Sequence, residues 1–350
     1  MATVTLFTLE HPRGLAGATL VEDGPLELVY EHGGRRGAVP AHAVVRVVRT
    51  GDRHEAELLR LDGLLARAAW RAVEARAAAM LETPGLPGWA AARAAGTLAA
   101  ARLLRARVEG RGADEALAAF ARAESLARGT RLWARASYGL AEAALLAGQL
   151  ERARAAFARL ATGELAALAP WRWLGALGLL RTQVAAGQLA PALEGLAALE
   201  QTAGADPFGV EAAMQARVVR AEVLLAQGKP RAAAELLEPA REDPVWAGSP
   251  LLPLALNTLG AIYRASAGRH PDGSWKPEGL LAALPLHLRV VRYVVTDAVE
   301  RARALAGAVA GLRLAGQAEV ADMLAAELAE RFPQAAAARE LSHAPRAPGD

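Results

Sequence analysis

The chain has 350 residues, no cysteine, and 40 basic against 37 acidic side chains, which gives a net charge of +3. The missing cysteines exclude disulfides, thiolate zinc sites and cysteine nucleophiles. Arginine and acidic residues alternate along the chain instead of forming a one-sided basic stripe, which argues against nucleic-acid binding. The sequence shows no signal peptide and no uncharged run suited to a membrane span. We therefore expect a cytoplasmic protein, with unconventional export left open.

The first part of the chain, residues 1–52, has a β pattern. Short strand-forming runs occur at Val4–Leu9, Ala18–Val21, Leu26–Tyr30, Gly37–Val39 and Val44–Val48. The dipeptides Asp23-Gly24 and Gly33-Gly34 between them tolerate the positive φ of tight hairpin turns. A short turn at 40–43 precedes the last run. This pattern predicts a small SH3-like or Sm-like β-barrel module.

From Glu55 onward the apolar residues follow a helical period. The pattern predicts one long helix that ends near Thr83 and a second long helix from Trp89 to about Val108. We assign residues 53–335 to a helical array and residues 336–350, whose composition is typical of disordered segments, to a flexible tail.

One phrase recurs in the second half of the chain: a glycine, then an alanine, then a large apolar residue four positions later. Its copies are Gly148/Ala153/Phe157, Gly187/Ala192/Leu196 and Gly228/Ala233/Leu237. An earlier Ala116–Phe120 pair fits the same pattern, and successive alanines are 37, 39 and 41 residues apart. A glycine that ends one helix, followed by a helix with a small contact residue, predicts a helical hairpin. Repeated hairpins predict an α-solenoid.

These repeats resemble tetratricopeptide (TPR) hairpins, and the resemblance covers residues 90–335. The matching segments are Leu140-Ala141, Gly148-Gln149-Leu150, Leu259-Gly260 with Tyr263, and Gly316-Gln317 with Phe332-Pro333. Bacterial TPR-like proteins with a small β-rich segment ahead of the repeats are similar. The period exceeds the 34 residues of the family, which longer linkers between the repeats would explain. The resemblance implies a mostly α fold that binds other proteins.

The inner face of such an array is formed by the first helix of each hairpin. Counting from the turn glycines places eight side chains there as predicted partner contacts: Arg135, Tyr138, Glu142, Arg181, Gln215, Glu222, Asn257 and Arg264. The carboxylate clamp of lysine and asparagine known from chaperone-binding TPRs is not matched. A long loop, 266–278, adds His270 and Trp275 as a second candidate contact, although we favour the alternative of a tolerated surface insertion with Trp275 folded onto the core.

Catalytic and metal motifs are missing from the sequence. There is no His-Glu-x-x-His spacing, no phosphate-binding glycine loop and no Gly-x-Ser-x-Gly elbow. We expect no enzyme activity, no cofactor and no metal.

Three functions remain open. The first is a non-catalytic scaffold or adaptor that binds an unknown protein. The second is a self-assembling structural protein whose partners are copies of itself; Glu319, Asp322, Glu327, Glu330 and Arg331 would oppose this by forming a polar cap on the last hairpin. The third is weak nucleic-acid binding by the β module, through Arg35, Arg36, Arg46, Arg49 and Arg53.

Overall fold

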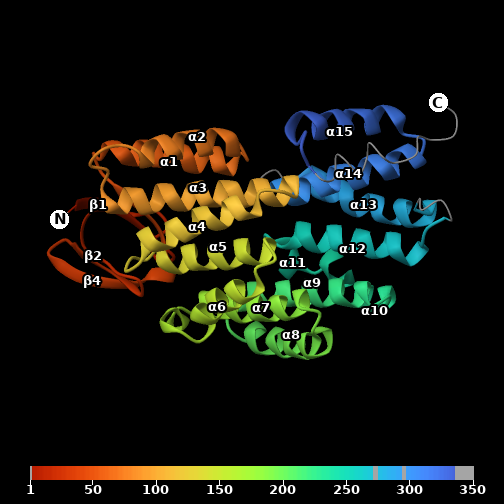
Figure 1. The fold of residues 1–350 in the computed structure, drawn as a ribbon, viewed down its shortest axis with the longest axis horizontal. Helices are drawn as coiled ribbons and strands as arrows, with labels where there is room; N and C mark the ends of the chain where they lie inside the picture. Colours follow the sequence, from red (N-terminus) through yellow and green to blue (C-terminus); the bar gives the residue numbers. More distant parts are fainter. Residues whose placement is uncertain (1, 271–274, 294–296, 336–350) are drawn as a thin grey trace. The chain divides into compact units, whose positions relative to one another are not determined.

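The computed structural model describes residues 2–270, 275–293 and 297–335, which contain five β-strands followed by fifteen α-helices (Figure 1). The chain divides into two compact units. The first comprises the residues up to Ala106 together with Gly112–Ala186, and the second comprises Arg107–Arg111 and the chain from Gly187 onward. The predicted tail, 336–350, lies outside the described residues.

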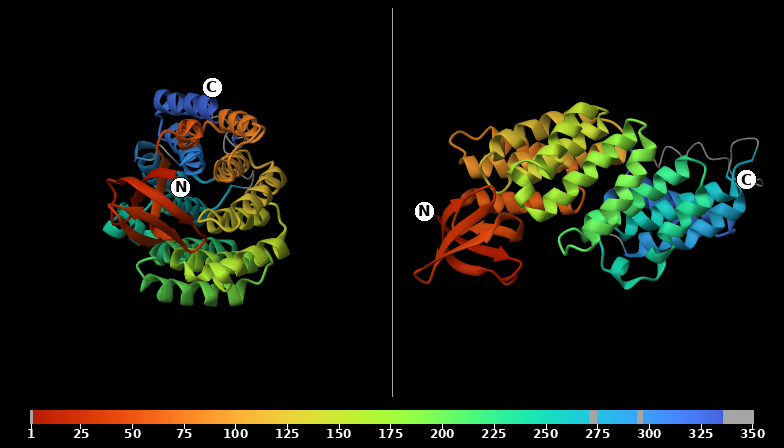
Figure 2. Two further views of the ribbon diagram at one scale, coloured as in Figure 1. Left: turned by 90° about the vertical axis from the view of Figure 1, so that its left-hand side faces the viewer. Right: turned by 90° about the horizontal axis from the view of Figure 1, so that it is seen from below.

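The β module is a five-stranded antiparallel sheet. Its strands are β1 (Ala2–Thr8), β2 (Leu15–Asp23), β3 (Glu27–His32), β4 (Arg35–Pro40) and β5 (Val44–Arg49). Strands β1 to β4 pair in succession, and β5 pairs with β1, which gives the order β4-β3-β2-β1-β5. A 3₁₀ turn, Ala41–Ala43, supplies the return. The strands curl around a core that includes Val4, Leu6 and Leu28 (Figure 2).

This arrangement confirms the prediction of a small β module ahead of the helices, in the form of a five-stranded antiparallel sheet. Gly33 and Gly34 both have positive φ, 57° and 73°, and form the tight turn between β3 and β4. Two consecutive positive φ values match the twist of a two-residue hairpin. Ala41 of the 3₁₀ turn is buried in the core of the first unit's helices, so the module packs directly against the helical array.

The helix predicted to run from Glu55 to Thr83 is two helices, α1 (Arg53–Ala66) and α2 (Trp70–Leu81). The break lies at Ala68, which has a φ of 56°. The backbone N–H of Ala69 donates to Leu64 and that of Ala68 to Leu65, the hydrogen bonds of a Schellman C-cap. Glycine usually occupies this left-handed position. Because alanine stands there, the sequence gives no signal for the break.

The remaining helices of the first unit continue as hairpins. They are α3 (Gly88–Glu109), α4 (Ala113–Ala127), α5 (Trp133–Leu146), α6 (Leu150–Ala161) and α7 (Ala169–Ala185). One apolar core runs through α3 to α6. Two phenylalanines pack against glycines of the helix that follows them. Phe120 of α4 lies against Gly139 of α5, where an ideal Cβ would be 2.0 Å from the ring. Phe157 of α6 lies against Gly178 of α7, where it would be 2.1 Å from the ring.

The second unit contains α8 (Leu189–Gly204), α9 (Val210–Ala226), α10 (Pro230–Leu237), α11 (Pro244–Ala247), α12 (Leu252–Ala267), α13 (Pro277–Tyr293), α14 (Ala298–Leu314) and α15 (Ala318–Arg331). Hairpins are formed by α9 with α10, α12 with α13, and α14 with α15. The predicted marker alanines Ala153, Ala192 and Ala233 are fully buried.

The turn glycines end the first helix of each hairpin as predicted. Gly148, Gly187, Gly228 and Gly316 have φ values between 71° and 77°. The residue after Gly148 donates its N–H to Ala144, five residues back, again a Schellman cap. The longer period has the expected origin, since short extra helices fill the linkers at 164–167 and 238–247. The fold is therefore a TPR-like array of helical hairpins with a small β module in front.

Candidate interaction surface

Three predicted partner contacts lie on α5: Arg135, Tyr138 and Glu142. Arg135 is exposed and forms no hydrogen bond or ion pair with the part of the chain that the structure describes. Tyr138 is half-buried, and its ring centroid lies 6.1 Å from that of Phe157 and 5.9 Å from that of Trp171. Arg135 is thus available to a partner, whereas Tyr138 is mainly part of an aromatic cluster between hairpins.

Glu142 is not the exposed contact that we expected. Its side chain is only 4% exposed and pairs with Arg181 of α7. The first helices of successive hairpins, α5 and α7, contact each other, so side chains that face the neighbouring helix meet there instead of facing solvent. The pair joins two repeats, and this corrects the prediction of a free surface at Glu142.

In the second unit the predicted contacts separate into surface and core. Glu222 is exposed on α9, and Gln215 is half-buried and donates to Glu211 at 3.4 Å. Arg264 is half-buried, with its guanidinium carbon 5.9 Å from the centroid of Trp275. Asn257, by contrast, is 6% exposed, so its predicted place on the surface is wrong.

Asn257 belongs to a buried polar cluster with His287 of α13 and Glu300 of α14. Its Nδ2 donates to the Glu300 backbone oxygen and to Oε2, both at 2.8 Å. Its Oδ1 lies 3.0 Å from His287 Nδ1; since Oδ1 only accepts, His287 Nδ1 carries the proton. Burial, reinforced by the charge of Arg264, lowers the pKa of His287 to about 3. Burial also raises the pKa of Glu300.

His287 takes the place that a large apolar residue has in the other repeats. It follows Ala283 by four positions, as Phe157 follows Ala153. Its ring lies against Gly307 of α14, where an added Cβ would be 2.4 Å away, just as Phe157 lies against Gly178. The sequence spacing contained this signal, which the long loop before α13 obscured. The cluster holds α12, α13 and α14 together.

The loop contacts predicted at His270 and Trp275 differ in exposure. His270 is exposed. Trp275 is half-buried, pairs with Arg269 in a short antiparallel bridge, and stacks with that guanidinium carbon 3.7 Å from its ring centroid. The tryptophan thus folds back on its own loop. Residues 271–274 lie outside the described residues.

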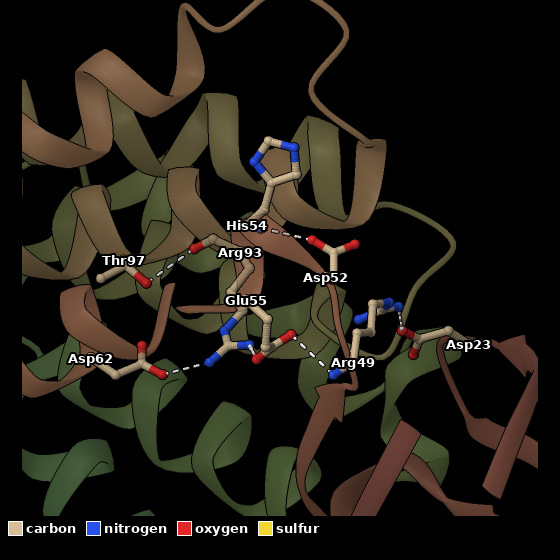
Figure 3. A network of polar contacts seen from close by, with 8 residues as sticks. All are labelled: Asp23, Arg49, Asp52, His54, Glu55, Asp62, Arg93 and Thr97. Atoms are coloured by element: carbon tan, nitrogen blue, oxygen red, sulfur yellow. Dashed lines mark hydrogen bonds and ion pairs between the residues drawn. The ribbon is translucent and has the colours of Figure 1, made fainter. Parts of the chain in front are cut away.

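The β module is fixed to the helices by a network of buried charges (Figure 3). Arg93 of α3 donates to Glu55 Oε1 and to Asp62 Oδ2, both at 2.6 Å. Glu55 Oε2 accepts the backbone N–H of Arg49 at 3.3 Å, which connects the end of β5 to α1. Burial alone would lower the pKa of Arg93, but hydrogen bonds with the two carboxylates raise it. Sequence reasoning missed this network because its members are far apart in the chain.

Within the described ranges, no group of three or more histidine or acidic side chains could hold a metal ion. Among the helices described, none combines the length and apolar character that crossing a bilayer requires.

Comparison with known proteins gives no family. No family model and no curated protein matches the chain. Among solved structures, it is similar to the nearly identical TPR-like repeats of the putative kinesin light chain of Podosopora anserina. A variant of that protein with one glutamine replaced by methionine is 20% identical over 57% of this chain and 94% of the other, with a TM-score of 0.39. The unsubstituted form has the same identity and coverage, with a TM-score of 0.38. At these values the likeness carries no argument about function.

Proposed function

We propose that the chain is a non-catalytic scaffold that binds another protein through the first helices of its hairpins. The observation that supports this is the hairpin array itself, since stacked repeats present successive helices as one extended surface. In the first unit, Arg135 offers a charged group on that surface without an internal partner among the described residues. Protein partners therefore suit this fold better than small substrates do.

The test is quantitative co-purification from the source cells with three forms of the tagged chain. Arg135→Glu reverses an exposed charge on α5, and Arg152→Glu reverses a second exposed charge on α6, the second helix of the same hairpin. Arg181 is unsuitable because its loss would remove an ion-pair partner of the buried Glu142. A partner that is retained by Arg152→Glu and lost with Arg135→Glu supports the proposal. A partner retained by both variants contradicts binding at α5.

Self-association is the second candidate, and α15 favours it. The predicted polar cap is incomplete: Met323 is 67% exposed and Val320 42% exposed on this last described helix. Glu327, another member of the predicted cap, forms an ion pair with Arg301 of α14 at 2.7 Å. Light scattering behind size exclusion tests this candidate. A mass that rises with concentration and returns to that of one chain in Met323→Lys supports it, and a single-chain mass at every concentration contradicts it.

A further inference from the structure

Arg49, the last residue of β5, is a buried cation with unused hydrogen-bond donors. The residue is 8% exposed. Its guanidinium group forms no hydrogen bond with any described residue, and the acid paired with it, Asp23, is 3.9 Å away (Figure 3). An arginine carries five N–H donors. No Arg49 nitrogen is among the fully buried polar atoms that lack a partner in the described part of the chain, so its unused donors reach solvent.

The neighbouring charged groups do not supply acceptors for these donors. Asp23 also faces Arg131, whose Nε is 3.4 Å from Asp23 Oδ1, so one carboxylate is shared by two guanidinium groups. Glu55 is already engaged by Arg93 and by the Arg49 backbone. Burial, opposed by Asp23 and reinforced by Arg131, lowers the pKa of Arg49. No described carboxylate therefore accepts a hydrogen bond from the Arg49 guanidinium group, although Asp23, Glu55 and Asp52 all lie near enough to oppose the lowering of its pKa.

Arg49 opens into a surface hollow of about 460 Å³. The other lining residues are Thr3, Thr50, Gly51, Asp52 and Trp89. The guanidinium carbon lies 3.9 Å from the centroid of the Trp89 ring. Stacking on the ring occupies a face of the guanidinium group and leaves the donors at its edge to point outward. The volume lies within the range of small-ligand pockets.

We propose that this hollow binds a carboxylate, with Arg49 as its anchor and the threonine hydroxyls as further donors. Two parallel N–H···O bonds to one carboxylate would satisfy the guanidinium group. Asp52 selects the class of anion. Its Oδ1 accepts the N–H of His54 at 2.8 Å, and its negative charge at the rim repels a phosphate dianion more strongly than a carboxylate. The site lies at the β module and does not depend on the proposed role of the hairpin helices.

The test is saturation-transfer NMR on the full chain with two small probes. N-acetylglycine carries a carboxylate, and its amide has the same shape without the charge. We expect a saturable signal from the acid alone, at least tenfold weaker in Arg49→Lys, because lysine cannot form the bidentate pair. Arg135→Lys, the same change at an exposed arginine, should leave the signal intact.

Three results would overturn the proposal: equal signals from acid and amide, equal signals from the two lysine variants, or tighter binding of methyl phosphate than of N-acetylglycine. A second readout does not rely on a variant's folding. In the unmodified chain labelled with ¹⁵N-arginine, the acid should shift one buried side-chain N–H resonance saturably, and sodium chloride at equal ionic strength should not. A resonance that responds equally to both salts would refute the site.

Discussion

Acid should destabilise the helices around His287, because this histidine is buried in its neutral form. The unfolded chain binds a proton on this histidine with a pKa of 6.5, whereas the folded chain does so at about 3. Between these values the unfolded state holds more protons, so stability falls as the pH falls below 6.5. At about 1.4 kcal/mol per pKa unit, the loss is about 2 kcal/mol at pH 5 and about 4 kcal/mol at pH 3, where the folded state also takes up the proton. Glu300 works in the opposite direction, because its raised pKa favours proton uptake by the folded state.

One variant separates the contribution of His287 to this pH dependence from that of Glu300. His287→Gln does not titrate but leaves Glu300 in place, so the difference between it and the unmodified chain isolates the histidine. Hydrogen–deuterium exchange of peptides from α12 to α14, corrected for the intrinsic rate, gives the local free energy of opening. The free energy of opening of the unmodified chain, measured relative to His287→Gln, should fall by about 2 kcal/mol between pH 7.5 and pH 5. His32→Gln, at an exposed histidine of the β module, is the matched control.

The reasoning fails if the difference between His287→Gln and the unmodified chain is the same at both pH values. It also fails if His32→Gln changes the pH dependence of α12 to α14 as strongly as His287→Gln does. Either result would mean that His287 accepts a proton without unfolding, and that the burial of its ring does not control the charge.

Three further perturbations test the packing by urea or thermal unfolding. Ala68→Gly should stabilise the first unit by about 1 kcal/mol, because glycine adopts the left-handed conformation of this position without strain. Ala75→Gly, in the middle of α2, should destabilise it by about as much. The reasoning is contradicted if both variants change the free energy of unfolding in the same direction. Gly178→Ala should destabilise by about 1–3 kcal/mol through overlap with Phe157, and F157L should restore part of the loss; full stability of the single variant would exclude the clash. Arg93→Met should destabilise by about 3 kcal/mol because it strands two carboxylates, one of them buried, and no effect would show that the network contributes little.

Local signals predicted much of the fold. Turn glycines such as Gly148 carry a backbone requirement that no other residue meets easily, so their positions marked the hairpins. Gly33 and Gly34 did the same for the β module. These features depend only on neighbouring residues, and a pattern along the chain can reveal them.

The misplaced residues depend on contacts between distant segments. Glu142 and Asn257 have the composition of a polar surface, and only the approach of a second helix buries them. Ala68 adopts a left-handed backbone conformation, which the presence of an alanine does not predict. Arg49 was one of five arginines of the β module assigned to weak nucleic-acid binding, and in the folded chain it is only 8% exposed. Exposure of a charged side chain therefore could not be predicted from its offset in a repeat.

The order of contacts along the chain bears on how the protein is synthesised. Helices α4 to α7 each contact the helix that precedes or follows them, and so do α12 to α15. The β module closes when β5 reaches β1, a separation of about 45 residues or less. Loops this short form early, and local contacts favour rapid folding. A chain leaving the ribosome can thus pack α4 to α7, and later α12 to α15, as each of these helices is completed.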